Sequence, residues 1–255
     1  MSLFTSKPYF LSVGCLFKNE SDSIVEWIEH YIHNGVEHFF LINDNSTDNS
    51  VELLQPYIDS GLVTLFNAVW ANYLGRQKDM YNCYIFPEIQ RTQWIIIVDM
   101  DEYLWSREQS DLRFMFKQCE NYGQVQFNHT IYGSNGHIQQ PKGIIKHFTK
   151  RTAEAPTLSV KNLKYAINTN FSFNGLNVHH ADFSDPHNQM YDFKIIDDPY
   201  FILNHYCCQS KEFWDNVKCC RGDSDHYRVR LPEQFDEFDF NDVEDTELAE
   251  RSIST

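Results

Sequence analysis

The sequence predicts an α/β fold in which helices flank a mainly parallel sheet, followed by a smaller mixed region. The main observation is that apolar runs of strand length alternate with segments of helical periodicity through the first hundred residues. A second observation is that short polar clusters follow three of these runs. Because right-handed crossovers bring the carboxyl ends of such strands to one edge of the sheet, we expect a ligand to bind beyond that edge.

The expected elements follow one another in a regular order. Strands are predicted at 10–17, 38–42, 62–66 and 94–98. Three helices are predicted between these strands. The first is capped by Ser21 and ends at Gly35, and the second is capped by Asp48 and ends at Gly61. The third runs from Arg76 to Phe86. After residue 111 the pattern changes to a helix at 112–119 and shorter strand-like runs at 125–131, 143–148 and 201–206.

The composition indicates a folded protein and excludes some classes of partner. Hydrophobic residues make up 42% of the 255 residues, which is enough for a sizeable core. The formal net charge is −15. Binding of nucleic acid or of an anionic membrane surface depends on clustered Lys and Arg, so neither kind of partner is expected.

One domain is expected at 1–232, and an acidic segment at 233–255 is expected to form a solvated helix or a loose tail. No apolar run approaches the ~20 residues that span a bilayer, and the first residues do not resemble a signal peptide. Seven cysteines without a CxxC pair predict free thiols in a reducing compartment. We therefore expect a cytoplasmic protein with no transmembrane segment.

The stretch WIIIVDMDEYLW, from Trp94 to Trp105, places carboxylates directly behind the fourth predicted strand. Asp99 and Asp101 are two residues apart where the chain turns, so both side chains can converge on one point. Two close carboxylates repel each other unless a cation or a proton lies between them. Hard oxygen ligands suit Mg²⁺ or Mn²⁺, which often bind carboxylates together with phosphate oxygens. The pattern predicts a metal-bound diphosphate, and a solvated strand end is the simpler alternative.

The first ~105 residues resemble the GT-A nucleotide-sugar glycosyltransferases of family 2 and, most closely, of family 92. The resemblance rests on motifs in a fixed order, which are Lys18-Asn19-Glu20, Glu26-Trp27, Asn43 to Asp48, Gln77 and Asp99 to Tyr103. The second half contains shorter matches to the family, such as Tyr132 to Gly136 and Asn204-His205-Tyr206. By this resemblance, 1–105 is the nucleotide-binding half and 106–232 the acceptor-side half of a GT-A domain.

The resemblance also implies a role for each matching position. The donor, a UDP- or GDP-sugar, would be bound by Asn19, Glu20, Asp44, Arg76, Gln77, Lys78 and Asp99. Asp99, Asp101 and His205 would bind Mn²⁺ or Mg²⁺. Arg76 to Lys78 also open a predicted helix, whose amino end favours phosphate.

The reaction implied is transfer of a sugar to a glycan or a lipid-linked sugar with inversion at the anomeric carbon. Inversion requires a base on the acceptor side. The stretch VHHADFSDPH offers Asp182 as the first candidate and Asp185 as the second, and Asp223 is a further one. Trp105, Tyr132 and Trp214 are candidates for stacking on sugars, although core packing is the commoner use of such side chains.

Two alternatives stay open. A sugar nucleotidyltransferase also binds a diphosphate with a metal, but its first strand is followed by a glycine-rich basic loop, and here that position reads CLFKNESDS. A non-catalytic module that binds sugars or proteins would need neither a metal nor a donor.

Overall fold

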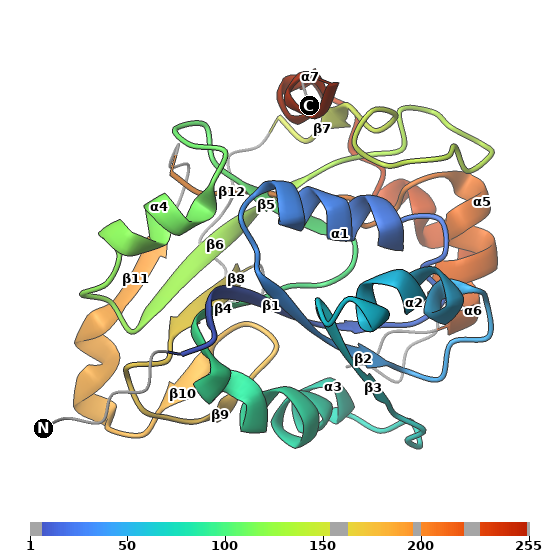
Figure 1. Cartoon of the computed structure of the whole chain (residues 1–255). Helices are drawn as coiled ribbons and strands as arrows, with labels where there is room; N and C mark the ends of the chain where they lie inside the picture. The colour runs from blue at the N-terminus through green and yellow to red at the C-terminus, as the bar shows by residue number, and fades with distance from the viewer. Residues whose placement is uncertain (1–6, 154–162, 196–199, 222–229, 254–255) are drawn as a thin grey trace, which may run out of the picture.

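The computed structural model describes residues 7–153, 163–195, 200–221 and 230–253. Its centre is a sheet of nine strands in the described part of the chain, with the order β3-β2-β1-β4-β8-β6-β12-β5 and with β11 paired to β6 (Figure 1). The strands are β1 (Tyr9–Phe17), β2 (His38–Asn43), β3 (Val63–Asn67), β4 (Thr92–Ile97), β5 (Glu102–Trp105), β6 (Gln124–Ile131), β8 (Leu163–Asn168), β11 (Asp192–Ile195) and β12 (Ile202–His205).

The first four strands pair in parallel, and their carboxyl ends therefore share one edge. Beyond β4 the sheet is mixed, since β8 is antiparallel to both β4 and β6, and β5 is antiparallel to β12. The predicted α/β class, with a mainly parallel half and a mixed second half, is thus confirmed.

Helices cover both faces of the sheet (Figure 1). They are α1 (Ile24–His33), α2 (Ser50–Asp59), α3 (Arg76–Met80), η1 (Tyr81–Ile85), η2 (Phe86–Arg91), α4 (Leu112–Gln118), η4 (Pro186–Tyr191), α5 (Lys211–Phe213), η5 (Trp214–Lys218), α6 (Cys219–Arg221), η6 (Pro232–Glu237) and α7 (Glu247–Ile253). The small strands β9 (Phe173–Leu176) and β10 (Ala181–Phe183) form a hairpin.

Two cores lie on the two faces. On one face, Trp27 and Tyr31 of α1 and Phe116 of α4 pack on the sheet with no exposed surface. On the other face, η1 and the β9–β10 hairpin pack through residues such as Tyr81 and Leu176. The helical spacing of apolar residues in α1 therefore predicted its buried face correctly.

One sequence expectation is wrong. The run 143–148 is not a strand but a turn, because the backbone N–H of Ile145 is bonded to the Glu26 carboxylate at 3.2 Å instead of to a neighbouring strand.

The acidic segment, expected as a solvated helix or a loose tail, does contain a helix, α7. It is not loose, because β13 (Val243–Glu244) pairs with β7 (Lys150–Arg151) and the side chains of Leu248 and Ala249 are buried.

Within the described part of the chain, no helix has the length and apolar character that crossing a membrane requires. The seven cysteines form no disulfide. The cytoplasmic location stays a prediction.

Candidate active site

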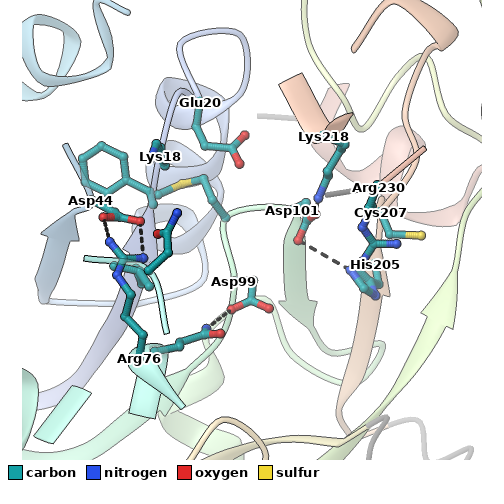
Figure 2. A pocket seen from close by; sticks show the side chains of 15 residues that line it. Lys18, Glu20, Asp44, Arg76, Asp99, Asp101, His205, Cys207, Lys218 and Arg230 are labelled. Atoms are coloured by element: carbon teal, nitrogen blue, oxygen red, sulfur yellow. Dashed lines mark hydrogen bonds and ion pairs between the residues drawn. The ribbon is translucent and has the colours of Figure 1, made fainter. Parts of the chain in front are cut away.

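A polar pocket lies at the carboxyl ends of β1, β2 and β4 and faces the end of β12 (Figure 2). Its lining residues are Leu16, Phe17, Lys18, Glu20, Asp44, Asn72, Arg76, Gln77, Asp99, Met100, Asp101, His205, Cys207, Lys218 and Arg230. The polar clusters behind three strands therefore meet at one edge, as the strand order predicted.

At one end of the pocket, Asp44 and Arg76 form a buried ion pair. Asp44 follows β2, and its backbone N–H donates to the carbonyl oxygen of Phe17 at 2.8 Å, which extends the parallel β1–β2 pairing to the edge of the sheet. Arg76 Nη1 donates to Asp44 Oδ2 at 2.8 Å and Nη2 donates to Oδ1, so the contact is bidentate. Arg76 is thus not a free cation at an exposed helix start, because its guanidinium neutralises Asp44.

In the middle of the pocket, Asp99 is held by two side chains. Lys164 Nζ lies 2.7 Å from Asp99 Oδ2, and Gln77 Nε2 donates to Asp99 Oδ1 at 3.1 Å. Glu102 supports the turn from below, since its Oε2 accepts the Asp99 backbone N–H at 2.7 Å and lies 3.7 Å from Lys164. Burial lowers the pKa of Lys164, but Asp99 and Glu102 outweigh it and raise that pKa above its ordinary value.

Asp101 lies at the other end, between two cationic side chains. Lys218 Nζ is 2.5 Å from Asp101 Oδ2, and His205 Nε2 is 3.5 Å from Asp101 Oδ1. Burial raises the pKa of Asp101, but Lys218 and His205 hold it well below its ordinary value. Burial lowers the pKa of His205, and the Asp101 carboxylate overcomes this effect and raises it to about 9.

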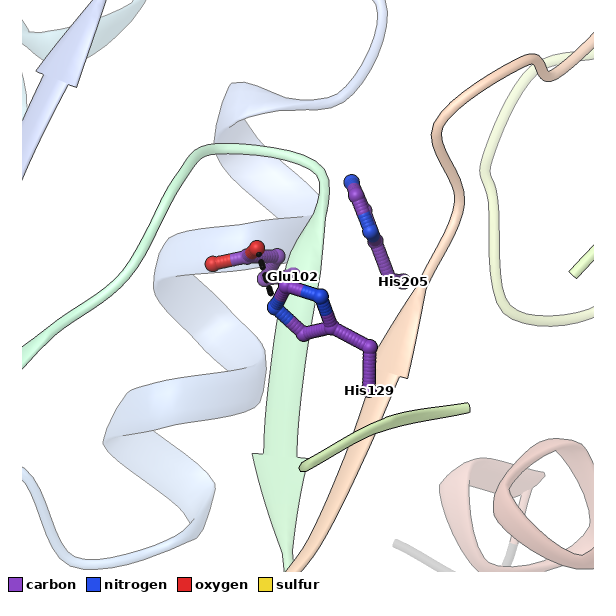
Figure 3. Close-up of side chains that lie close together, drawn as sticks. All are labelled: Glu102, His129 and His205. Atoms are coloured by element: carbon purple, nitrogen blue, oxygen red, sulfur yellow. Dashed lines mark ion pairs between the residues drawn. The ribbon is translucent and has the colours of Figure 1, made fainter. Parts of the chain in front are cut away.

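Behind this pocket, Glu102, His129 and His205 form a cluster of ligand-type side chains (Figure 3). One ligand atom from each lies within 4.8 Å of the others, and His129 Nε2 is 2.8 Å from Glu102 Oε1. Glu102 and His129 do not line the pocket. Together with Lys164 they form a buried support for the turn that carries Asp99 and Asp101.

The residues at the Asp101 end fit a divalent cation. The 3.5 Å between Asp101 Oδ1 and His205 Nε2 matches two ligands that each lie ~2.1 Å from one metal ion. A carboxylate combined with an imidazole suits Mn²⁺ better than Mg²⁺. Both oxygens of Asp99 contact Lys164 or Gln77, just as both oxygens of Asp101 contact Lys218 or His205, so a role for Asp99 as a ligand stays a prediction.

Some predicted donor-binding residues lie outside the pocket. Asn19 adopts φ 54°, and its side-chain oxygen accepts the Thr47 backbone N–H at 2.8 Å, so it braces the two loops behind β1 and β2. Lys78 is half-buried on α3 and is not a lining residue. Glu20 and Gln77 do line the pocket.

The candidate bases lie elsewhere in the fold. Asp182 Oδ1 is 3.1 Å from His180 Nε2, beside a different cavity. Asp185 is exposed and caps η4 by accepting the His187 backbone N–H at 2.9 Å. Asp223 lies outside the described residues. A catalytic role for Asp182 or Asp185 stays a prediction.

The three aromatic candidates for sugar stacking, Trp105, Tyr132 and Trp214, are all buried in the core.

Sequence reasoning identified Arg76 but missed three other basic residues in or behind the site. Lys164, Lys218 and Arg230 come from β8, from η5 and from the segment before η6. The only signal for Lys164 was a lysine inside the apolar run LKYAIN, and nothing in the sequence marked Lys218 or Arg230.

The family model for glycosyltransferase family 92 matches residues 7–238. Two relatives carry the same family description. One from Oryza sativa subsp. japonica is 22% identical over 151 residues, which is 58% of this chain and 26% of that protein. One from Ricinus communis is 21% identical over 117 residues, which is 46% of this chain and 21% of that protein. The matched region therefore spans about a quarter of the length of these curated relatives.

Two solved structures show a more distant likeness. S. aureus TarS 1–349 in complex with UDP-GlcNAc has a TM-score of 0.46 at 14% identity, over 90% of this chain and 64% of that chain. The mannosyltransferase PcManGT from Pyrobaculum calidifontis, in complex with GDP-Man and Mn²⁺, has a TM-score of 0.44 at 12% identity, over 76% of this chain and 56% of that chain. Likeness of this degree assigns no ligand and no residue to the present chain.

Proposed function

The chain belongs to glycosyltransferase family 92, and we propose that it transfers a sugar from a UDP- or GDP-sugar to a hydroxyl group of a glycan, with inversion and with the help of a divalent cation. The observation that carries the proposal is that Asp44, Asp99 and Asp101 line one pocket at the edge of the sheet.

The two ends of the pocket would bind different parts of the donor. The Asp44 end accepts the base or ribose, because a carboxylate fixed by Arg76 presents oriented acceptor atoms to hydroxyl or N–H groups. The Asp101 end accepts the diphosphate. Lys218 and Arg230 line that end, and their positive charges favour phosphate oxygens there.

Asp101 and His205 would bind the divalent cation, which supplies Lewis-acid stabilisation of the negative charge that builds on the leaving diphosphate. Lys218 contacts Asp101 at 2.5 Å and is therefore close enough to turn toward a phosphate oxygen when the donor binds. Glu102 and Lys164 keep the turn in place, so that little reorganisation is required during the reaction.

Metal-dependent donor hydrolysis tests the proposal. A screen of UDP- and GDP-sugars with Mn²⁺ should find one donor that is slowly hydrolysed, and Asp101→Asn should lower that rate by about a hundredfold or more. Asp215→Asn is a suitable control, because Asp215 is half-buried and paired with Lys211 outside the pocket. A nucleotidyltransferase would instead prefer a nucleoside triphosphate, and a binding module would hydrolyse nothing.

A further inference from the structure

A second cavity lies between β6, β10 and η4, on the face of the sheet that carries the β9–β10 hairpin. It measures about 730 Å³, which is in the range of pockets that take small organic ligands. Its polar lining consists of Gln124, Gln126, His180, Asp182, Gln189 and Asp192. None of these side chains lines the donor pocket.

The floor of this cavity carries a buried amide with an unused acceptor. Gln126 is 2% exposed, and its Nε2 donates to the His179 carbonyl at 3.3 Å. Its Oε1 has no hydrogen-bond partner among the described residues. A buried polar atom left without a partner costs about 1–3 kcal/mol, so a ligand that donates a hydrogen bond there gains in affinity.

The amide side chains of Gln124, Gln126 and Asn128 form a row along one face of β6, and this row runs toward the end of β6 that lies nearer the donor pocket. Asn128 is two residues beyond Gln126, so its side chain leaves the same face of β6. Both side-chain polar atoms of Asn128 are buried without a partner in the described part of the chain. Asn128 pairs in register with Leu163, the residue before Lys164, although the Lys164 side chain itself leaves the opposite face of the sheet to contact Asp99. From Gln124 to Asn128 the row extends about 13 Å at ~3.3 Å per residue.

The negative charge of the cavity lining disfavours anionic ligands and favours uncharged ones. Among the described residues that line the cavity there is no Lys or Arg, but there are two carboxylates, Asp182 and Asp192. Phosphate, sulfate and carboxylate groups would therefore be repelled. Glutamine amides both donate and accept hydrogen bonds, which matches hydroxyl groups, and the half-buried Phe183 adds an apolar surface.

We propose that this cavity binds non-reacting units of an extended, uncharged oligosaccharide whose terminal sugar reaches the donor pocket. The inference rests on the proposed function, because it makes this oligosaccharide the acceptor. Binding energy from the remote units lowers the KM for long acceptors relative to short ones.

Saturation-transfer NMR on the whole chain tests the cavity without any donor. The probes are maltotriose, cellotriose, mannotriose and chitotriose, with trigalacturonic acid as the charged counterpart. At least one neutral trisaccharide should bind, the acid should not, and the matching monosaccharide should bind at least tenfold more weakly. Gln126→Leu should weaken trisaccharide binding at least tenfold.

Gln189→Ala on the exposed wall serves as a second variant in case Gln126→Leu unfolds, and should weaken binding about threefold or more. Gln90→Leu, on the exposed surface of η2, is the matched control. The inference is overturned if no neutral trisaccharide binds, or if binding is equal in the wild type and both cavity variants. Binding of UDP or GDP with Mn²⁺ is measured in parallel, and its absence would refute the proposed function instead.

Discussion

Lys164 Nζ lies 2.7 Å from the Asp99 carboxylate, and the lysine side chain is only 1% exposed. This ammonium group comes from β8, which is far from Asp99 in the sequence but is the direct neighbour of β4 in the sheet. The turn behind β4 is therefore neutralised from within the protein, before any ligand binds.

Replacing Lys164 by Met should destabilise the protein by about 3 kcal/mol or more, because Asp99 and Glu102 would lose their buried cation. Chemical denaturation measures the change in the free energy of unfolding. Lys211→Met is the control, since Lys211 pairs with Asp215 at the surface and its loss should cost less than about 1 kcal/mol. Equal effects of the two variants would contradict a structural role for Lys164.

Arg76→Lys should weaken nucleoside diphosphate binding by about tenfold, equivalent to ~1.4 kcal/mol. Lysine keeps the positive charge but cannot donate two parallel bonds to Asp44, so the carboxylate loses its fixed orientation. Titration calorimetry with UDP and GDP in the presence of Mn²⁺ measures the affinity. Arg91→Lys, which alters the partly exposed pair with Glu88, should bind as the wild type does. An unchanged affinity in Arg76→Lys would remove Arg76 from the donor site.

Much of the parallel half was predictable from the sequence, because local patterns determine it. Apolar runs and helical spacing predicted β1 to β4 together with α1 and α2, and the shared sheet edge followed from the strand order. The region after Asp101 was less predictable. β5 has only four residues, and the β9–β10 hairpin lies in a stretch with no clear alternation of apolar and polar side chains.

The site shows the same division. The sequence indicated Asp44, Asp99 and Asp101 because each follows a strand that is easy to recognise. Lys218 reaches the pocket only through the position of η5, and Lys164 reaches Asp99 from behind the pocket only through the pairing of β8 with β4. These are tertiary relationships between distant segments, and a single sequence contains no local signal for them.

We expect the protein to lose stability in mild acid, because His30 is buried. Burial lowers the pKa of His30 to about 4, and its Nε2 lies 2.9 Å from the Leu104 carbonyl oxygen. The unfolded chain binds this proton near pH 6.5. Between pH 6.5 and 4 the unfolded state therefore holds more protons, and stability falls as the pH falls, by about 3 kcal/mol in total.

Denaturation of the wild type and of His30→Gln across this pH range measures the effect. The variant should show a shallower dependence on pH, whereas the exposed His33→Gln should keep the slope of the wild type. Parallel slopes for the wild type and His30→Gln would show that His30 does not carry the pH dependence.

Asp182→Asn distinguishes two roles for this residue. A catalytic base predicts a fall in kcat of about 10²–10⁴. A position at the rim of the second cavity predicts a higher KM for an oligosaccharide acceptor with little change in kcat, and we expect this result because Asp182 is not a lining residue of the donor pocket. Steady-state transfer assays separate the two. Asp185→Asn, at the second candidate base, is measured in parallel, and a large loss of kcat in Asp182→Asn alone would support a catalytic role for Asp182.

The most direct measurement is the position of Mn²⁺ in crystals grown with UDP or GDP, located by its anomalous scattering. The proposed donor site predicts one strong peak between Asp101 Oδ1 and His205 Nε2, with the diphosphate beside it and Lys218 turned away from Asp101. A peak at another place in the molecule, or a diphosphate bound there without any metal peak, would contradict it.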